Sequence, residues 1–92
     1  RSDQAGLWNN LAMLQLKLGK NQEAAKNFQK AIHLQPDYAN AHFYLAVALT
    51  RLHQLDEARR HKLYAVKINP DFKKIKGEKM ISGNIIELFS GS

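Results

Sequence analysis

Pro36-Asp37-Tyr38-Ala39 recurs thirty-four residues further along the chain as Pro70-Asp71-Phe72-Lys73. Between the two copies lie two amphipathic segments separated by a short turn. An internal period of this length is typical of stacked helical hairpins, in which each repeat is a pair of antiparallel helices. The sequence therefore predicts an all-α fold, a stack of antiparallel helical hairpins with about five helices.

The same offset relates the whole of residues 5–38 to residues 39–72. Most identical pairs are small or apolar, as expected for positions inside a packed stack. The identical pairs are Ala5/Ala39, Leu11/Leu45, Ala12/Ala46, Leu18/Leu52, Glu23/Glu57, Ala24/Ala58, Ala31/Ala65, Pro36/Pro70 and Asp37/Asp71. We therefore expect one domain, 1–92, made of repeat 1 (5–38), repeat 2 (39–72) and a capping helix (73–89).

The size and composition are those of an ordinary globular chain, with 92 residues, 45% of them hydrophobic, and no cysteine. Charged residues such as Lys17, Arg51 and Lys67 interrupt every apolar stretch, so none reaches the roughly 18–20 residues of a membrane span. We therefore expect no membrane insertion. The chain starts at Arg1 without a secretory leader, which indicates a piece of a longer protein and makes the cytoplasm the default location.

The apolar residues predict where the helices run. Four leucines fall at the i, i+4, i+7 and i+11 positions of one helix over about residues 5–18, and we expect them to form its buried stripe. They are Leu7, Leu11, Leu14 and Leu18. Gly19 is expected to end this helix. Further helices are expected from Asn21 onward, over 39–52 and over 55–68, with Asn21 and Asp37 as N-caps.

Repeat 1 also carries a recognisable signature, made of Trp8, Leu11, Ala12, Gly19, Ala24, Phe28, Ala31 and Pro36. This pattern resembles the tetratricopeptide repeat family, and repeat 2 matches it at Leu45, Ala46, Ala58, Ala65 and Pro70. The resemblance implies a right-handed superhelix whose first helices line a concave groove, and a protein-binding role without a reaction. Four residues depart from the family pattern, namely Gln15, His42, His53 and Lys62. We expect His42 to be a buried substitute for Trp8.

The resemblance implies that a partner peptide or helix lies in this groove. Because stacking places equivalent residues side by side, we expect an apolar rung, a basic rung and a polar rung across the first helices. The rungs are Met13/Val47/Ile81, Lys17/Arg51 and Asn10/Tyr44/Glu78. The candidate groove residues are Asn9, Asn10, Met13, Lys17, Asn40, Phe43, Tyr44, Val47, Arg51, Glu78 and Ile81.

Alternatives stay open for the main candidates. Phe43 and Tyr44 are the strongest anchors if they face solvent, because exposed aromatic residues often dominate binding. The alternative is that both rings pack beneath the tail or the neighbouring first helix. For Lys17 and Arg51 we favour a solvated helix end over a carboxylate site.

Other function classes find less support. The net charge of +6 suggests RNA binding as the alternative function, but the basic residues are spread evenly rather than gathered into one stripe. His33, His42, His53 and His61 show no i, i+4 pair that would hold a metal. We therefore expect a protein or peptide partner, and no enzyme activity, cofactor, metal or small-molecule substrate.

The number of repeats leads to one further expectation. Stacked arrays normally need about three repeats, so the outer face of the helix over 55–68 requires a cover. The tail over 73–89 is a weak helix former because it contains Gly77 and Gly83. We therefore expect a weak homodimer through this helix and the tail.

Overall fold

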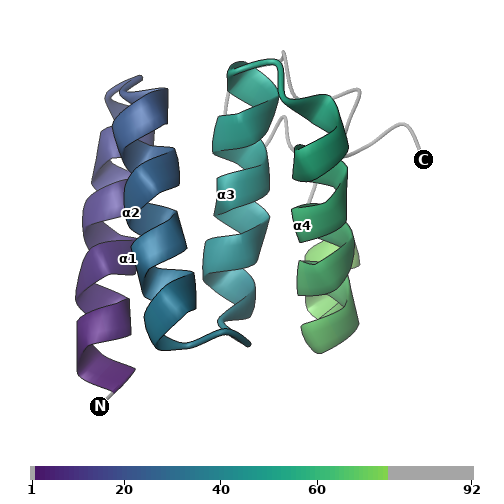
Figure 1. The fold of residues 1–92 in the computed structure, drawn as a ribbon. Coiled ribbons are helices and arrows are strands. Elements are labelled where there is room, and N and C mark those ends of the chain that lie inside the picture. Colours follow the sequence, from purple (N-terminus) through teal and green to yellow (C-terminus); the bar gives the residue numbers. More distant parts are fainter. Residues whose placement is uncertain (1, 75–92) are drawn as a thin grey trace.

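The fold is a stack of helical hairpins. A computed structural model describes residues 2–74, and in this part of the chain four α-helices lie side by side with alternating direction (Figure 1). They are α1 (Ser2–Lys17), α2 (Asn21–Leu34), α3 (Ala39–Arg51) and α4 (Leu55–Ile68), followed by a short 3-10 helix, η1 (Pro70–Lys74). Of the expected capping helix (73–89), residues 73 and 74 belong to η1, and the remainder, with Glu78 and Ile81, lies outside the described residues. The all-helical hairpin architecture is confirmed.

Small residues let the two helices of each hairpin approach closely. Ala12 of α1 and Ala24 and Ala31 of α2 are all fully buried, as are Ala58 and Ala65 of α4. Helices can approach this closely only where one of them presents little side chain. The second hairpin packs on the first because α2 lies against α3. As a result α3 is sandwiched between α2 and α4, and almost every residue over 41–50 is buried.

The buried face of α1 is not the expected one. The structure buries Ala5, Asn9, Ala12 and Leu16, whereas the four leucines expected in the core face outward. Their exposed fractions are 68% for Leu7, 41% for Leu11, 55% for Leu14 and 65% for Leu18. The reason is the position of α1, which packs on α2 and only lightly on α3, with no described element on its other side. The prediction of a buried leucine stripe was wrong.

The turns inside the two hairpins have the same backbone form. Gly19 ends the first hairpin's helix with φ 81°, and His53 occupies the equivalent place with φ 65°. The predicted caps, however, were wrong. The N-cap residues of α2 and α3 are Lys20 and Tyr38, and neither makes a side-chain capping hydrogen bond. Within residues 2–74, none of the helices is long and apolar enough to cross a membrane.

Candidate functional site

The face formed by α1 and α3 carries the residues expected to line the groove, and the structure divides them into three groups. Asn10 and Lys17 are exposed, while Met13, Asn40, Tyr44 and Arg51 are partly buried. The remaining described candidates are Phe43 and Val47, which have no exposed surface, and Asn9, which is 5% exposed. Access to a partner is therefore limited to the first two groups.

Phe43 and Tyr44 take part in a row of aromatic rings. The Phe43 ring is stacked on Phe72 of η1 with 4.8 Å between centroids, and its neighbour Tyr44 meets it edge-on at 5.1 Å. On its other side Tyr44 faces Phe28 of α2, with centroids 6.5 Å apart. Phe43 therefore packs in the core, in line with the structural alternative. Tyr44 keeps part of its surface, and burial of the rest raises the pKa of its hydroxyl.

Arg51, at the end of α3, reaches across to the first hairpin. Its Nη1 donates hydrogen bonds to the carbonyl oxygen of Leu16 at 3.1 Å and to Oδ1 of Asn21 at 3.3 Å. Asn21 therefore accepts from Arg51 instead of capping α2. Because the Leu16 carbonyl directly precedes Lys17 in the chain, the bond holds the guanidinium close to the backbone of Lys17. The two members of the expected basic rung thus end at the same edge of the α1–α3 face.

The charge of Arg51 has no acidic counterpart in the described residues. Both of its hydrogen-bond acceptors are neutral, and the ion pair seen in this part of the chain joins Arg59 to Asp56 on α4. Partial burial lowers the pKa of Arg51, but the guanidinium stays protonated at neutral pH because its ordinary pKa lies far above neutral. The guanidinium has five N–H donors, so donors remain for an acidic ligand.

The comparison with protein families settles the nature of the repeat. A family model described as tetratricopeptide repeat matches residues 9–71, which is more than half of the chain. The chain belongs to the tetratricopeptide repeat family. Tetratricopeptide repeats generally mediate protein–protein interaction, which confirms the general protein-binding role expected from the sequence. No curated protein gives a significant match to this chain.

Two departures from the tetratricopeptide repeat pattern, Gln15 and Lys62, lie at partly buried positions. Gln15 replaces the usual aromatic residue of the first helix, and its Oε1 accepts a 2.7 Å hydrogen bond from Nδ2 of Asn27. Lys62 replaces the aromatic found at Phe28, is only partly buried, and has its pKa lowered by that burial. Asn9 is less well satisfied, because its buried Oδ1 has no hydrogen-bond partner in the described residues.

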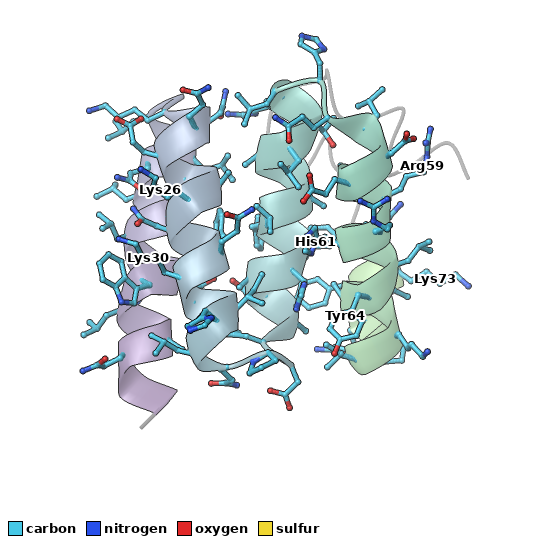
Figure 2. All side chains as sticks on the ribbon, in the orientation of Figure 1. Lys26, Lys30, Arg59, His61, Tyr64 and Lys73 are labelled. Atoms are coloured by element: carbon cyan, nitrogen blue, oxygen red, sulfur yellow. The ribbon has the colours of Figure 1, made fainter. Side chains whose placement is uncertain are left out.

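His42, a third departure, is buried as expected, but it belongs to a pair that the sequence did not reveal. Its Nδ1 lies 2.9 Å from Nδ1 of His61, which extends from α4 toward α3 (Figure 2), and its Nε2 lies 2.8 Å from the carbonyl oxygen of Pro36. Since a carbonyl only accepts, Nε2 of His42 carries the proton. In neutral His42 the Nδ1 atom is then the acceptor, and Nδ1–H of His61 donates to it.

The geometry of this pair suits a shared proton better than a metal ion. The ring centroids are 5.1 Å apart, close to the 2.9 Å separation plus two ring radii, so the two nitrogens point at each other edge to edge. A metal ion at about 2.0 Å from each nitrogen has no room on that line. Among the described residues no group of three or more His, Cys, Asp or Glu side chains could hold a metal.

The histidine pair lies beneath an open pocket on the face opposite the groove candidates. Glu57 and Arg60 line this pocket, and Tyr64 lies edge-on to His42 with centroids 4.5 Å apart. Burial, assisted by His42, lowers the pKa of His61, whereas Glu57 opposes this effect. The i, i+4 spacing that indicates a metal pair applies within one helix, whereas His42 lies on α3 and His61 on α4. The thirty-four-residue offset makes His61 the equivalent of Asn27, which is buried. The sequence therefore did contain a signal that His61 faces the interior.

Proposed function

We propose that this tetratricopeptide repeat module binds an acidic segment of a partner protein across α1 and α3, with a carboxylate of the partner at Arg51 and Lys17. The observation that carries the proposal is the arrangement of Arg51. The guanidinium is anchored to the backbone of α1 and has no acidic partner in the described residues. An anchored guanidinium loses little conformational freedom when it binds a carboxylate, and such charge-assisted bonds are the stronger ones.

The rest of the accessible face fits an extended peptide or a helix. Met13 and Tyr44 supply partly exposed apolar surface beside the basic edge, and Asn10 supplies an exposed amide. Tyrosine is common at binding hot spots because one side of its ring is apolar and its hydroxyl can hydrogen-bond. A partner would therefore place an apolar side chain near Tyr44 and an acidic one near Arg51. The net charge of +6 would speed its approach.

Fluorescence anisotropy with labelled peptides tests this proposal. The probes are short peptides that combine leucine with aspartate and glutamate, and matched peptides in which asparagine and glutamine replace the acidic residues. We expect the acidic set to contain binders that lose at least about tenfold in affinity with the Arg51→Gln variant, because a hydrogen bond to a charged group contributes about 1.5–3 kcal/mol. Lys17→Gln should weaken the same peptides to a smaller extent, since Lys17 is solvated.

Lys26→Gln is the matched control, because Lys26 is an exposed lysine on the outer side of α2 (Figure 2). It removes one positive charge away from the α1–α3 face. Equal affinity for the acidic and amide peptides would contradict the proposal, as would an equal effect of Lys26→Gln and Arg51→Gln. Binding of single-stranded RNA that depends on Lys26 as much as on Arg51 would favour the nucleic-acid alternative. Circular dichroism confirms that each variant is folded.

A further inference from the structure

The histidine pair ties together three segments of the fold. His42 belongs to α3, His61 belongs to α4, and the carbonyl oxygen that accepts from His42 Nε2 belongs to Pro36, in the connection between α2 and α3. The His42 residue is 5% exposed, and Tyr64 of α4 lies edge-on to its ring (Figure 2). We call the two histidines and the Pro36 carbonyl the histidine latch.

Helix α4 has few other buried residues to hold it in place. Its buried residues are two alanines, Ala58 and Ala65, whereas α2 has five buried residues, including Phe28. Within the described part of the chain, α4 packs mainly on α3 and more lightly on η1. Because hydrophobic stabilisation scales with the apolar area removed from water, two alanines contribute modestly. The latch therefore matters more for the attachment of α4 than a polar pair would for α2.

The neutral latch has one nitrogen that is free to take a proton. His42 Nε2 donates to the carbonyl and His61 Nδ1 donates to His42 Nδ1, which leaves Nε2 of His61. That atom has no hydrogen-bond partner among the described residues, and it keeps contact with solvent. A first proton on Nε2 of His61 therefore leaves both hydrogen bonds of the latch in place.

A second proton cannot be accommodated in the same way. The remaining ring nitrogen is Nδ1 of His42, where a proton would face the N–H of His61 across 2.9 Å. Both rings would then be cationic, with their centroids 5.1 Å apart. A buried cation without a partner is strongly unfavourable, so His42 needs water to hold this proton. Because His61 and Tyr64 lie against its ring, hydration requires α4 to move away.

The surrounding charges also act through α4. The described residues that line the pocket above the latch are Glu57, Arg60 and Tyr64 of α4, together with Ile32 of α2 and Pro36. Glu57 favours a positive charge on His61, whereas Arg60 opposes it. Burial and His42 outweigh Glu57, and they lower the pKa of His61. The stability that the latch contributes is therefore present above the ordinary histidine range and is lost as the pH falls.

We propose that the histidine latch is a pH switch, which releases α4 from α3 when both histidines become protonated. In the released state both rings are hydrated and titrate as ordinary histidines, near pH 6.5. From about pH 6.5 to about pH 5.0, the equilibrium constant for release then rises about tenfold if the closed latch already holds one proton, and more than about a hundredfold if it holds none. The switch does not depend on the acidic-peptide site, because Arg51 lies at the other end of α3.

Amide hydrogen exchange on the full 92-residue chain, corrected for the intrinsic effect of pH, tests the release. We expect the opening that exposes α4 amides to rise at least about tenfold between about pH 6.5 and about pH 5.0. At the lower pH we expect α4 to be at least about tenfold less protected than α2, because α4 opens without the first hairpin. Unchanged protection of α4 would overturn the proposal. So would equal protection of α2 and α4 at the lower pH.

Two variants connect the release to the latch. His42→Trp combined with His61→Asn carries the residues of the first hairpin, Trp8 and Asn27, and titrates at neither position. Its α4 protection should change less than about twofold over the same pH range. The matched control, His33→Asn, removes an exposed histidine of α2 and should keep the full response of the parent. A parent-like response in the double variant, or a lost response in the control, would overturn the proposal.

Nitrogen chemical shifts of the imidazole rings, measured by NMR on the parent, test the latch without any substitution. At neutral pH we expect His42 to be protonated at Nε2 and His61 at Nδ1, as the hydrogen bonds require. On acidification we expect both rings to become charged as α4 loses protection. The opposite tautomers at neutral pH would overturn the proposal. Two charged rings with α4 still protected would overturn it as well.

Discussion

Replacing His53 by glycine should stabilise the protein. His53 has φ 65°, a left-handed backbone conformation, while the equivalent residue of the first hairpin is Gly19 with φ 81°. The two turns are closed by matching hydrogen bonds. Gly19 N–H donates to Leu16 O at 3.0 Å, and His53 N–H donates to Thr50 O at the same distance. The second turn therefore imposes on a histidine the backbone conformation that suits glycine.

The size of the effect follows from two opposing terms. The left-handed conformation costs a residue with a Cβ about 1–2 kcal/mol, which His53→Gly removes. Glycine also raises the conformational entropy of the unfolded chain, which offsets the gain in stability by about 0.4–1 kcal/mol. The exposed His53 side chain makes no hydrogen bond in the described structure that would be lost. We expect a net gain of about 0.5–1 kcal/mol, or roughly 2–8 °C in melting temperature for a domain of this size.

Thermal and urea melts followed by circular dichroism measure this gain, and two variants control it. Gly19→Ala should lose about 1 kcal/mol from backbone strain alone, because a Cβ built at Gly19 has no atom within 4 Å. His53→Ala should bring no such gain, because it keeps a Cβ in the left-handed conformation. A lower or unchanged melting temperature for His53→Gly would refute the reasoning.

Three other predictions follow from the packing and from the histidine pair. Phe28→Ala should cost about 3–5 kcal/mol in urea unfolding, because its ring is fully buried, and Trp8→Ala should cost clearly less, because its ring is half-buried and faces Lys30 Nζ at 4.2 Å. Phe43→Ala should destabilise the protein about as much as Phe28→Ala; a melting temperature near that of the parent would show that Phe43 is not a core residue. Stability should fall as the pH drops from about 7.5 to 5.5, because the pKa of His61 is lowered on folding and the unfolded chain then binds the extra proton. His61→Gln should flatten this pH dependence, and an unchanged slope would contradict the assignment.

The repeat architecture was predictable because local sequence patterns specify where each helix begins and ends. The thirty-four-residue offset, Gly19 and the two prolines placed both ends of α3 and α4, and the start of α2, within one residue of those observed. These signals act over a few residues, where backbone sterics and helix periodicity decide the outcome. The predicted N-cap Asn21 is instead the first residue of α2, and its side chain bonds to another helix. Its Oδ1 is used by Arg51, thirty positions away, and no local rule anticipates that contact.

The site depends on contacts between helices that periodicity does not specify. Arg51 was expected to be a solvated helix end, and only the packing of α3 beside α1 brings it to the Leu16 carbonyl. Phe43 and Tyr44 are adjacent in the chain and were treated alike. They separate because α3 has neighbours on both sides: Phe43 meets Phe72 inside the core, while Tyr44 retains an accessible edge.

The leucine stripe shows most clearly what a sequence period can and cannot establish. The period correctly identified one apolar face on α1, with Leu7, Leu11 and Leu14 in line. It could not say whether this face is buried, because burial depends on a neighbouring element, and within residues 2–74 α1 packs mainly on α2 and only lightly on α3. The small face with Ala5 and Ala12 packs on α2 instead, since alanine permits the closer approach. An apolar period therefore identifies an apolar face of a helix, and whether that face is buried depends on the elements that pack against it.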